Sequence, residues 1–140
     1  MIVLDTNVIS EPTRPQPSPN VINWLNAQDR SQIYTTTITQ AEILLGLAAM
    51  AAGKRREMTA AHMNRILAEE FAGRILPFDS AAARELHAVA RRKNGKYVIE
   101  PDSQIAAIAK AHDAILATRN IKDFRNSGLK LINPWTGEKA

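Results

Sequence analysis

The sequence contains no cysteine, which excludes disulfide bonds, thiol nucleophiles and cysteine-based zinc sites. Any metal ion must therefore be held by oxygen or imidazole ligands. Aromatic residues make up only 5% of the chain and are not interleaved with basic residues, which argues against a platform that stacks unpaired bases. No glycine-rich phosphate loop of the GxGxxG or GxxxxGKS/T form is present, so a dinucleotide or ATP site is not expected.

Long apolar runs are absent as well. The N-terminal run 1–4 is too short for a signal peptide, and no later run approaches the roughly 18 residues that would span a membrane. We therefore expect a cytoplasmic protein with no membrane contact. The 140 residues, 45% of them hydrophobic and 23% charged, fit a single globular domain over 1–140.

The balance of charge is basic. A net charge of +4 and a pI near 9.7 favour an anionic partner such as nucleic acid. Basic residues cluster at Lys54–Arg56 and at Arg91–Lys93, although such clusters are more often solvated helix faces than binding sites. If the protein binds nucleic acid, we expect phosphates rather than bases to be its main contacts.

Apolar segments of strand length alternate with segments of helical period. Strands are predicted at 1–4, 33–37, 74–77, 115–118 and 131–132. Helices are predicted at about 21–30, 39–53, 55–71, 80–94 and 101–112, the fourth with Asn94-Gly95 as its C-cap. The four prolines between residues 12 and 19 indicate a loop. This alternation predicts an α/β fold with a parallel sheet and helices on both of its faces.

Four acidic residues lie at the ends of predicted strands or at the starts of predicted helices: Asp5, Glu42, Asp102 and Asp123. Each of the three aspartates has a structural explanation when it is considered alone. Asp5 could cap the turn after the first strand. Asp102 and Asp123 lie in the first turn of helices, where an acid complements the helix dipole.

Glu42 has two explanations that the sequence leaves open. Thr39 and Glu42 form the pattern of a capping box, in which the glutamate binds back to the start of its helix. However, Glu42 is the only charged residue between Thr39 and Gly53, and it shares a helical face with Ile38 and Leu45. A lone carboxylate on an apolar stripe is costly to bury unless something compensates, so metal binding is the alternative.

The topology can bring all four acids to the carboxyl edge of the sheet, where such folds bind ligands. Their mutual repulsion would then require protonation or a bound cation. Nearby hydroxyl and amide groups complete an all-oxygen environment: Thr6, Asn7, Thr118 and Asn120. Oxygen ligands suit Mg²⁺ or Mn²⁺. Zinc would favour histidine, and His62, His87 and His112 lie within predicted helices away from the acids, where we interpret them as surface or packing residues.

Six segments carry a resemblance to a known family. They are Asp5-Thr6-Asn7 after an apolar strand, Ala41–Gly46 around Glu42, Phe71–Phe78, Asp102 with Ile105-Ala106-Ala107, Ala117–Asn120 with Asp123-Phe124, and Ile132–Trp135. Together, and in this order, they resemble the PIN-domain nucleases and most closely the VapC/FitB branch of toxins. The similarity extends over almost the whole chain, and all four acids of the family's quartet are present.

By this resemblance the protein is a metal-dependent ribonuclease, the toxin of a type II toxin–antitoxin pair, with a PIN-like α/β/α sandwich around a short central parallel sheet. Asp5, Glu42, Asp102 and Asp123 would bind one or two Mg²⁺ or Mn²⁺ ions, and Asp5 and Asp102 are the first candidates for direct ligands. The residues expected to support them, beside the metal or the substrate, are Thr6, Asn7, Thr118, Arg119 and Asn120. Arg119 could contact a phosphate or pair with a nearby acid.

The resemblance also implies partners. They are an RNA substrate, a second copy of the chain in a homodimer, and a small antitoxin with a DNA-binding domain that inserts an arginine or a helix near the acids. The complex would form a larger assembly on DNA. Two functions of other classes stay open: a non-catalytic PIN-like module that binds proteins, and a metal-dependent phosphatase. Phosphatases of that kind commonly carry Asp-x-Asp after the first strand, whereas this chain has Asp5-Thr6-Asn7.

Overall fold

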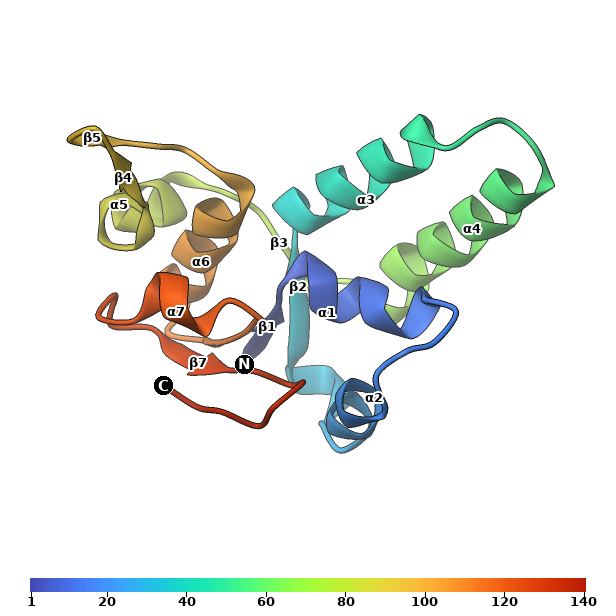
Figure 1. Ribbon diagram of the computed structural model, residues 1–140, viewed down its shortest axis with the longest axis horizontal. Helices are drawn as coiled ribbons and strands as arrows, with labels where there is room; N and C mark the ends of the chain where they lie inside the picture. Colours follow the sequence, from blue (N-terminus) through green and yellow to red (C-terminus); the bar gives the residue numbers. More distant parts are fainter.

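A five-stranded parallel sheet lies at the centre of the computed structural model, which describes residues 1–140 (Figure 1). Its strands are β1 (Ile2–Leu4), β2 (Ile33–Thr36), β3 (Ile75–Leu76), β6 (Ile115–Ala117) and β7 (Lys130–Ile132). They lie in the order β3-β2-β1-β6-β7, and all neighbours in this order pair in parallel. The predicted α/β class and the five predicted strands are confirmed.

The central strand β1 is buried on both faces. Val3 and Leu4 are 0% and 2% exposed. Because successive strand residues point to opposite faces of a sheet, Val3 packs with Leu116 in one hydrophobic core and Leu4 packs with Ala117 in a second core. A continuous apolar segment is what a strand in this position requires.

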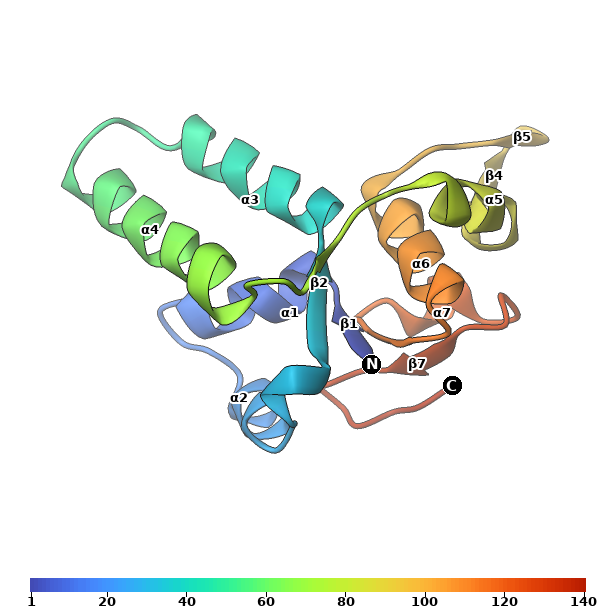
Figure 2. The ribbon, with the colours of Figure 1, turned by 180° about the vertical axis from the view of Figure 1, so that it is seen from behind.

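Helices cover both faces of the sheet, as Figures 1 and 2 show from opposite sides. One layer consists of α5 (Ser80–Val89), α6 (Pro101–Ala111) and α7 (Ile121–Phe124). The other consists of α1 (Thr6–Ser10), α2 (Pro19–Asn26), α3 (Thr37–Ala49) and α4 (Lys54–Arg65), and α4 continues into a π-helical turn (Ile66–Glu70). The predicted α/β/α sandwich is thus confirmed. None of these helices combines the length and the apolar character that crossing a membrane requires.

Two helix starts at the carboxyl edge of the sheet differ from the prediction, and α2 begins at Pro19, two residues before the predicted start. The short helix α1 was not predicted, because five residues are too few to show a helical period; it begins after Asp5, whose side chain accepts a hydrogen bond from the amide of Asn7. Helix α3 begins at Thr37 rather than Thr39, because the hydroxyl of Thr36 caps it and accepts a hydrogen bond from the amide of Thr39. The capping box with Thr39 as its cap is therefore wrong.

A small antiparallel hairpin replaces the end of one predicted helix. Helix α5 ends at Val89, and β4 (Arg92–Lys93) pairs with β5 (Lys96–Tyr97). Asn94 and Gly95 have φ angles of 52° and 76°, which suit a two-residue hairpin turn with two left-handed residues. The Asn-Gly pair is thus a hairpin turn and not the predicted C-cap.

Candidate active site

Four segments of the chain meet at the carboxyl edge of the sheet. In Figure 1, α1, α3 and α6 all begin near the ends of β1 and β2. Asp5 follows β1 and caps α1, and Glu42 lies in the second turn of α3. Asp102 is in the first turn of α6, and Asp123 is in α7 after β6. The fold therefore brings the ends of these elements, and their carboxylates, to one region.

Asp5 is the most buried of the four acids, with 4% of its surface exposed. Its Oδ2 accepts a 2.7 Å hydrogen bond from the hydroxyl of Thr118, and its Oδ1 accepts one of 3.3 Å from the amide of Asn7. Burial raises the pKa of Asp5 above its ordinary value of 3.8, the hydrogen bond from Thr118 opposes this, and the negative charges of Asp102 and Glu42 raise the pKa further. Two hydrogen bonds thus orient the Asp5 carboxylate, which lies in the electrostatic field of two other acids.

Glu42 ends a chain of threonine hydroxyls. The hydroxyl of Thr6 donates a 2.7 Å hydrogen bond to Oε1 of Glu42 and lies 3.0 Å from the hydroxyl of Thr39. Thr39 in turn lies 3.4 Å from the hydroxyl of Thr36. Because each hydroxyl carries one proton, the order that satisfies all four groups is Thr36 to Thr39 to Thr6 to Glu42. The half-buried carboxylate of Glu42 is thus oriented by Thr6, at the start of α1, and not by the backbone of its own helix.

Asp102 connects the remaining acids. Burial is the main cause that raises its pKa above the ordinary 3.8, followed by the negative charges of Asp123 and Glu100; Arg91 and a hydrogen bond from the Asn120 side chain oppose these effects. The backbone amide of Asn120 also donates to the hydroxyl of Thr118, the same hydroxyl that donates to Asp5. All four predicted acids thus form one electrostatically coupled group.

Glu100 and Arg91 lie at the rim of this group, and Glu100 was not among the predicted site residues. Glu100 is the N-cap residue of α6, a position that Pro101 at the first helical position could have indicated. Arg91 donates to Oε2 of Glu100 from Nε at 2.9 Å and from Nη2 at 2.8 Å. Arg91, Glu100, Asp102 and Asp123 line one shallow hollow.

Arg119 lines a hollow together with Asp123 and packs on the C-terminal segment. Its guanidinium lies 4.5 Å from the centre of the Trp135 ring, and it forms no ion pair with an acid. Asn20 donates a 2.8 Å hydrogen bond to the carbonyl of Trp135, which ties the same segment to α2. The predicted alternative of a salt bridge for Arg119 is therefore wrong, because its charge is used to pack the C-terminal segment.

The donor set suits Mg²⁺ or Mn²⁺ in its chemistry. All candidate metal ligands in the site are carboxylate, hydroxyl or amide oxygens, and the three histidines are exposed and lie elsewhere. No group of three acidic or histidine side chains is arranged closely enough to hold one ion directly. Mg²⁺ keeps several of its waters and is usually bound through one or two carboxylates, so a site without three closely spaced acids is compatible with it.

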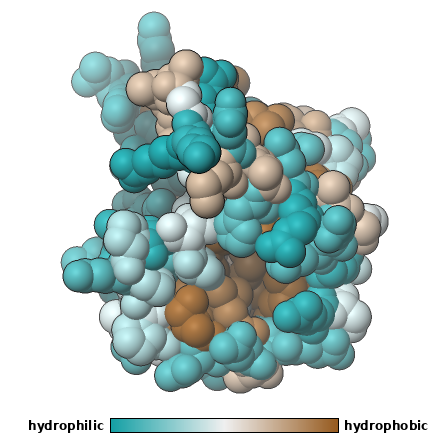
Figure 3. All heavy atoms as spheres, turned by 90° about the vertical axis from the view of Figure 1, so that its right-hand side faces the viewer, coloured by the Kyte–Doolittle hydropathy of each residue, from teal (hydrophilic) through white to brown (hydrophobic).

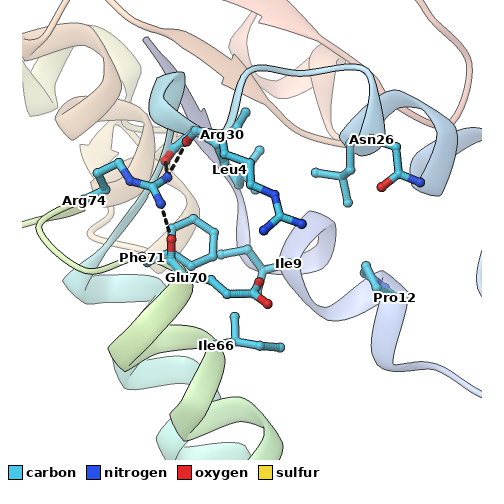
Figure 4. A pocket seen from close by; sticks show the side chains of 11 residues that line it. Leu4, Ile9, Pro12, Asn26, Arg30, Ile66, Glu70, Phe71 and Arg74 are labelled. Carbon is cyan, nitrogen blue, oxygen red and sulfur yellow. Dashed lines mark hydrogen bonds between the residues drawn. The ribbon is translucent and has the colours of Figure 1, made fainter.

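A second hollow lies on the face formed by α1, α2 and the π-helical turn, and it shares no residue with the acidic group. Figure 3 shows apolar atoms at the bottom of a hollow on this side of the molecule. Its apolar lining includes Ile9, Leu25 and Ile66, which Figure 4 shows in part from close by. Arg74 closes one end and donates to the backbone carbonyls of Glu70, Arg30 and Ile33. This is an apolar groove with polar ends.

Comparison with known proteins agrees with the fold. The family model of the PIN domain matches residues 2–128. The chain therefore belongs to the PIN-domain family. It is 45% identical to the VapC ribonuclease Y4jK of Sinorhizobium fredii over 138 residues, which are 96% of this chain and 98% of the relative. It is 41% identical to toxin FitB of Neisseria gonorrhoeae over 138 residues, 96% of this chain and 99% of that protein, and so lies in the VapC/FitB branch.

Solved structures give the same result. The structure of FitAB bound to an IR36 DNA fragment superimposes with a TM-score of 0.88 at 40% identity, covering 99% of this chain and 98% of that chain. VapBC2 from Rickettsia felis, bound to a DNA fragment from its promoter, superimposes with a TM-score of 0.73 at 25% identity, covering 95% and 98%. The predicted membership of the family is confirmed.

Proposed function

We propose that the protein hydrolyses phosphodiester bonds of RNA with the help of Mg²⁺ or Mn²⁺, as the toxin of a toxin–antitoxin pair. One observation carries the proposal: four carboxylates from distant parts of the chain form one coupled group in which burial and like charge raise the pKa values of Asp5 and Asp102. Such a group is costly for an isolated protein, and a divalent cation relieves the cost.

Each acid has a distinct part in this proposal. A bound divalent ion lowers the pKa of a water molecule and offsets the charge of a phosphate. Asp5 and Asp102 would hold the ion. Burial shields these two carboxylates from water, so water does not screen their attraction to a cation. Thr118 orients Asp5, and Thr6 orients Glu42. Glu42 or Asp123 would accept the proton of the attacking water.

The test uses the purified chain, free of any antitoxin, with total RNA in the presence and absence of Mn²⁺. We expect cleavage that needs the metal and that Asp5→Asn and Asp102→Asn each abolish. Asp113→Asn is the matched control, since this aspartate is exposed and remote from the site. If either site variant folds and cleaves at the wild-type rate, the assignment of the site is wrong.

Two results would favour the other classes of function. Hydrolysis of nitrophenyl phosphate without cleavage of RNA would indicate a phosphatase. Absence of Mg²⁺ and Mn²⁺ binding by calorimetry would indicate a module that only binds proteins. The observed pattern Asp5-Thr6-Asn7, with a hydroxyl used to orient Glu42, does not favour the phosphatase.

The same proposal includes partners. The toxin–antitoxin complexes FitAB and VapBC2 are structural neighbours in which DNA is bound, and we propose a small antitoxin with a DNA-binding domain for this chain too. The apolar groove beside α1 and α2 is of a kind that takes an amphipathic helix.

Leu45 on α3 and Met58 on α4 are 71% and 70% exposed, which supports a homodimer. Co-purification with the product of the neighbouring gene, and light scattering of the free chain, test these two partners.

A further inference from the structure

The β4–β5 hairpin is a charged arm at the outer corner of the molecule, beside α5 and α6 (Figures 1 and 2). Residues 91–100 contain four cations and one acid. All residues from 91 to 97 are exposed. Tyr97 is 56% exposed and Ile99 is 71% exposed, so most of the surface of these two large side chains is open.

The arm has a defined shape. The left-handed Asn94-Gly95 turn joins its strands, and Arg92 pairs with Tyr97 across them. The guanidinium of Arg92 lies 4.9 Å from the centre of the Tyr97 ring and also donates to the carbonyl of Gly95 at 3.1 Å. The amide of Val98 donates to the carbonyl of Arg91 and closes the base of the hairpin. A cation and an aromatic ring are therefore held side by side before any ligand arrives.

The charge of the arm is only partly neutralised. Arg91 and Lys93 both pair with Glu100, at 2.8 Å and 3.9 Å. Arg92 and Lys96 have no acidic partner within 4 Å. Neighbouring cations without counter-charges repel one another, and an anionic ligand would relieve this repulsion.

The base of the arm reaches the carboxylate site. Arg91 is bound to Glu100, and the two residues share a hollow with Asp102 and Asp123. A polyanion whose reacting phosphate lies at the carboxylates can therefore reach the arm on this side. Arg91 borders the acids, and the cations of the arm can offset the repulsion between these acids and a nucleic acid.

We propose that the β4–β5 hairpin binds single-stranded RNA next to the cleavage site. Arg92 and Lys96 bind backbone phosphates, and the Tyr97 ring stacks on an unpaired base, as aromatic side chains do in single-strand binding sites. The identity of the ligand as RNA rests on the function proposed above. The role of the arm in binding does not depend on catalysis and is measured separately.

The first experiment removes the two unpaired charges. Binding of a fluorescent single-stranded RNA oligonucleotide to the full chain is followed by anisotropy in chelator, so that no cleavage occurs. We expect the double variant R92Q/K96Q to raise the Kd about 10-fold and to lower the slope of log K against log salt by about 1.4, or roughly 0.7 for each phosphate contact. In Mn²⁺, the KM for RNA cleavage rises while kcat changes little.

The matched control removes the same charge elsewhere. Lys54 and Arg55 are exposed residues of the other basic cluster, on α4. The double variant K54Q/R55Q should leave the Kd for RNA close to the wild-type value. An equal effect of the two double variants would mean that only net charge matters, and it would overturn the proposal.

The second experiment tests stacking. Tyr97→Leu keeps apolar bulk but removes the aromatic ring, and we expect it to raise the Kd for single-stranded RNA about 10-fold without changing the salt slope. Tyr97→Phe should restore binding. Binding of duplex DNA should not respond to Tyr97→Leu, because paired bases are not free to stack on the ring. An equal loss with duplex DNA, or no loss with RNA, would overturn the stacking role.

The outcomes separate the arm from the catalytic proposal. If the wild-type chain cleaves no RNA with any divalent metal, the proposed function fails, whatever the arm does. If the arm variants bind and cleave RNA as the wild type does, the arm proposal fails while the nuclease stands. Loss of binding to a protein partner with RNA binding intact would assign the arm to that partner and would also overturn the inference.

Discussion

The hydroxyl of Thr118 donates a 2.7 Å hydrogen bond to Oδ2 of Asp5, and 113 residues separate the two in sequence. Both follow neighbouring strands, Asp5 after β1 and Thr118 after β6. Thr118 is fully buried and also accepts a hydrogen bond from the amide of Asn120. One hydroxyl therefore connects the first acid to the loop that leads to Asp123.

Thr118→Val tests this connection. Valine has nearly the same shape but no donor, so Oδ2 of Asp5 loses its partner and the pKa of Asp5 rises further. We expect RNA cleavage to fall about 10- to 100-fold, the range seen when groups that orient metal ligands are removed. Thr118→Ser keeps the hydroxyl and should keep most of the activity. Equal cleavage rates for the valine and serine variants would show that the bond is not needed.

The raised pKa of Asp102 makes stability depend on pH in a definite direction. A carboxyl whose pKa is higher in the folded state than in the unfolded state holds its proton more tightly when folded. Its contribution to stability is present below the ordinary pKa of 3.8 and is lost as the pH rises through the higher pKa of the folded protein. At neutral pH without metal, the ionised Asp102 therefore destabilises the protein.

Asp102→Asn should remove this effect. In chelator we expect the variant to be more stable than the wild type at pH 7.5, by on the order of 1 kcal/mol or about 3 °C in Tm. The advantage should shrink toward pH 4. Urea denaturation at the two pH values measures it, and Asp113→Asn on an exposed loop should show no such trend. A variant whose advantage is the same at both pH values would contradict the electrostatic explanation.

Substitution by valine at two adjacent threonines, Thr35 and Thr36, is expected to have opposite effects on stability. Thr35 and Thr36 are both 0% exposed at the end of β2. The hydroxyl of Thr35 has no hydrogen-bond partner, whereas that of Thr36 caps α3 by accepting from the amide of Thr39 at 3.1 Å. Thr35→Val should stabilise the protein by about 1 kcal/mol, since it removes an unpaired buried hydroxyl. Thr36→Val should destabilise it by about 1 kcal/mol, the usual effect of losing an N-cap.

Chemical denaturation of both valine variants measures these effects. Both substitutions replace a buried hydroxyl with a methyl group of similar volume. The two sites differ in the hydrogen bonding of the hydroxyl that is lost. Destabilisation by Thr35→Val similar to that of Thr36→Val would mean that the hydroxyl of Thr35 is paired in solution.

Arg119 is predicted to matter for stability and not for catalysis. Its guanidinium lies over Trp135, and an exposed cation–π contact of this kind contributes about 0.5–1 kcal/mol. Arg119→Ala should lower the free energy of unfolding by a similar amount and change the tryptophan fluorescence. The KM and kcat for RNA should stay at their wild-type values. A rise in KM would instead assign Arg119 to a substrate phosphate.

Local sequence patterns were sufficient for most of the fold. The apolar run at Ile2–Leu4 and the β-branched segment Ile33–Thr36 predict buried strands. The structure buries most residues of both segments, as their apolar or β-branched side chains favour. Errors occurred where a short-range signal had two meanings. Asn94-Gly95 suits both a helix C-cap and a hairpin turn, and only the pairing of Arg92 with Tyr97 decides between them.

The sequence by itself predicted the chemistry of the candidate site: oxygen-bearing side chains, four acids, and an order along the chain that matches a parallel sheet. It could not show that Glu42 is oriented by Thr6 rather than by its own helix, or that Glu100 and Arg91 border the acids. Those facts depend on how β1, β2 and α6 lie beside one another. Side-chain contacts between residues far apart in sequence arise only when strand pairing and packing of the two cores fix the positions of the helix starts, so tertiary structure alone decided them.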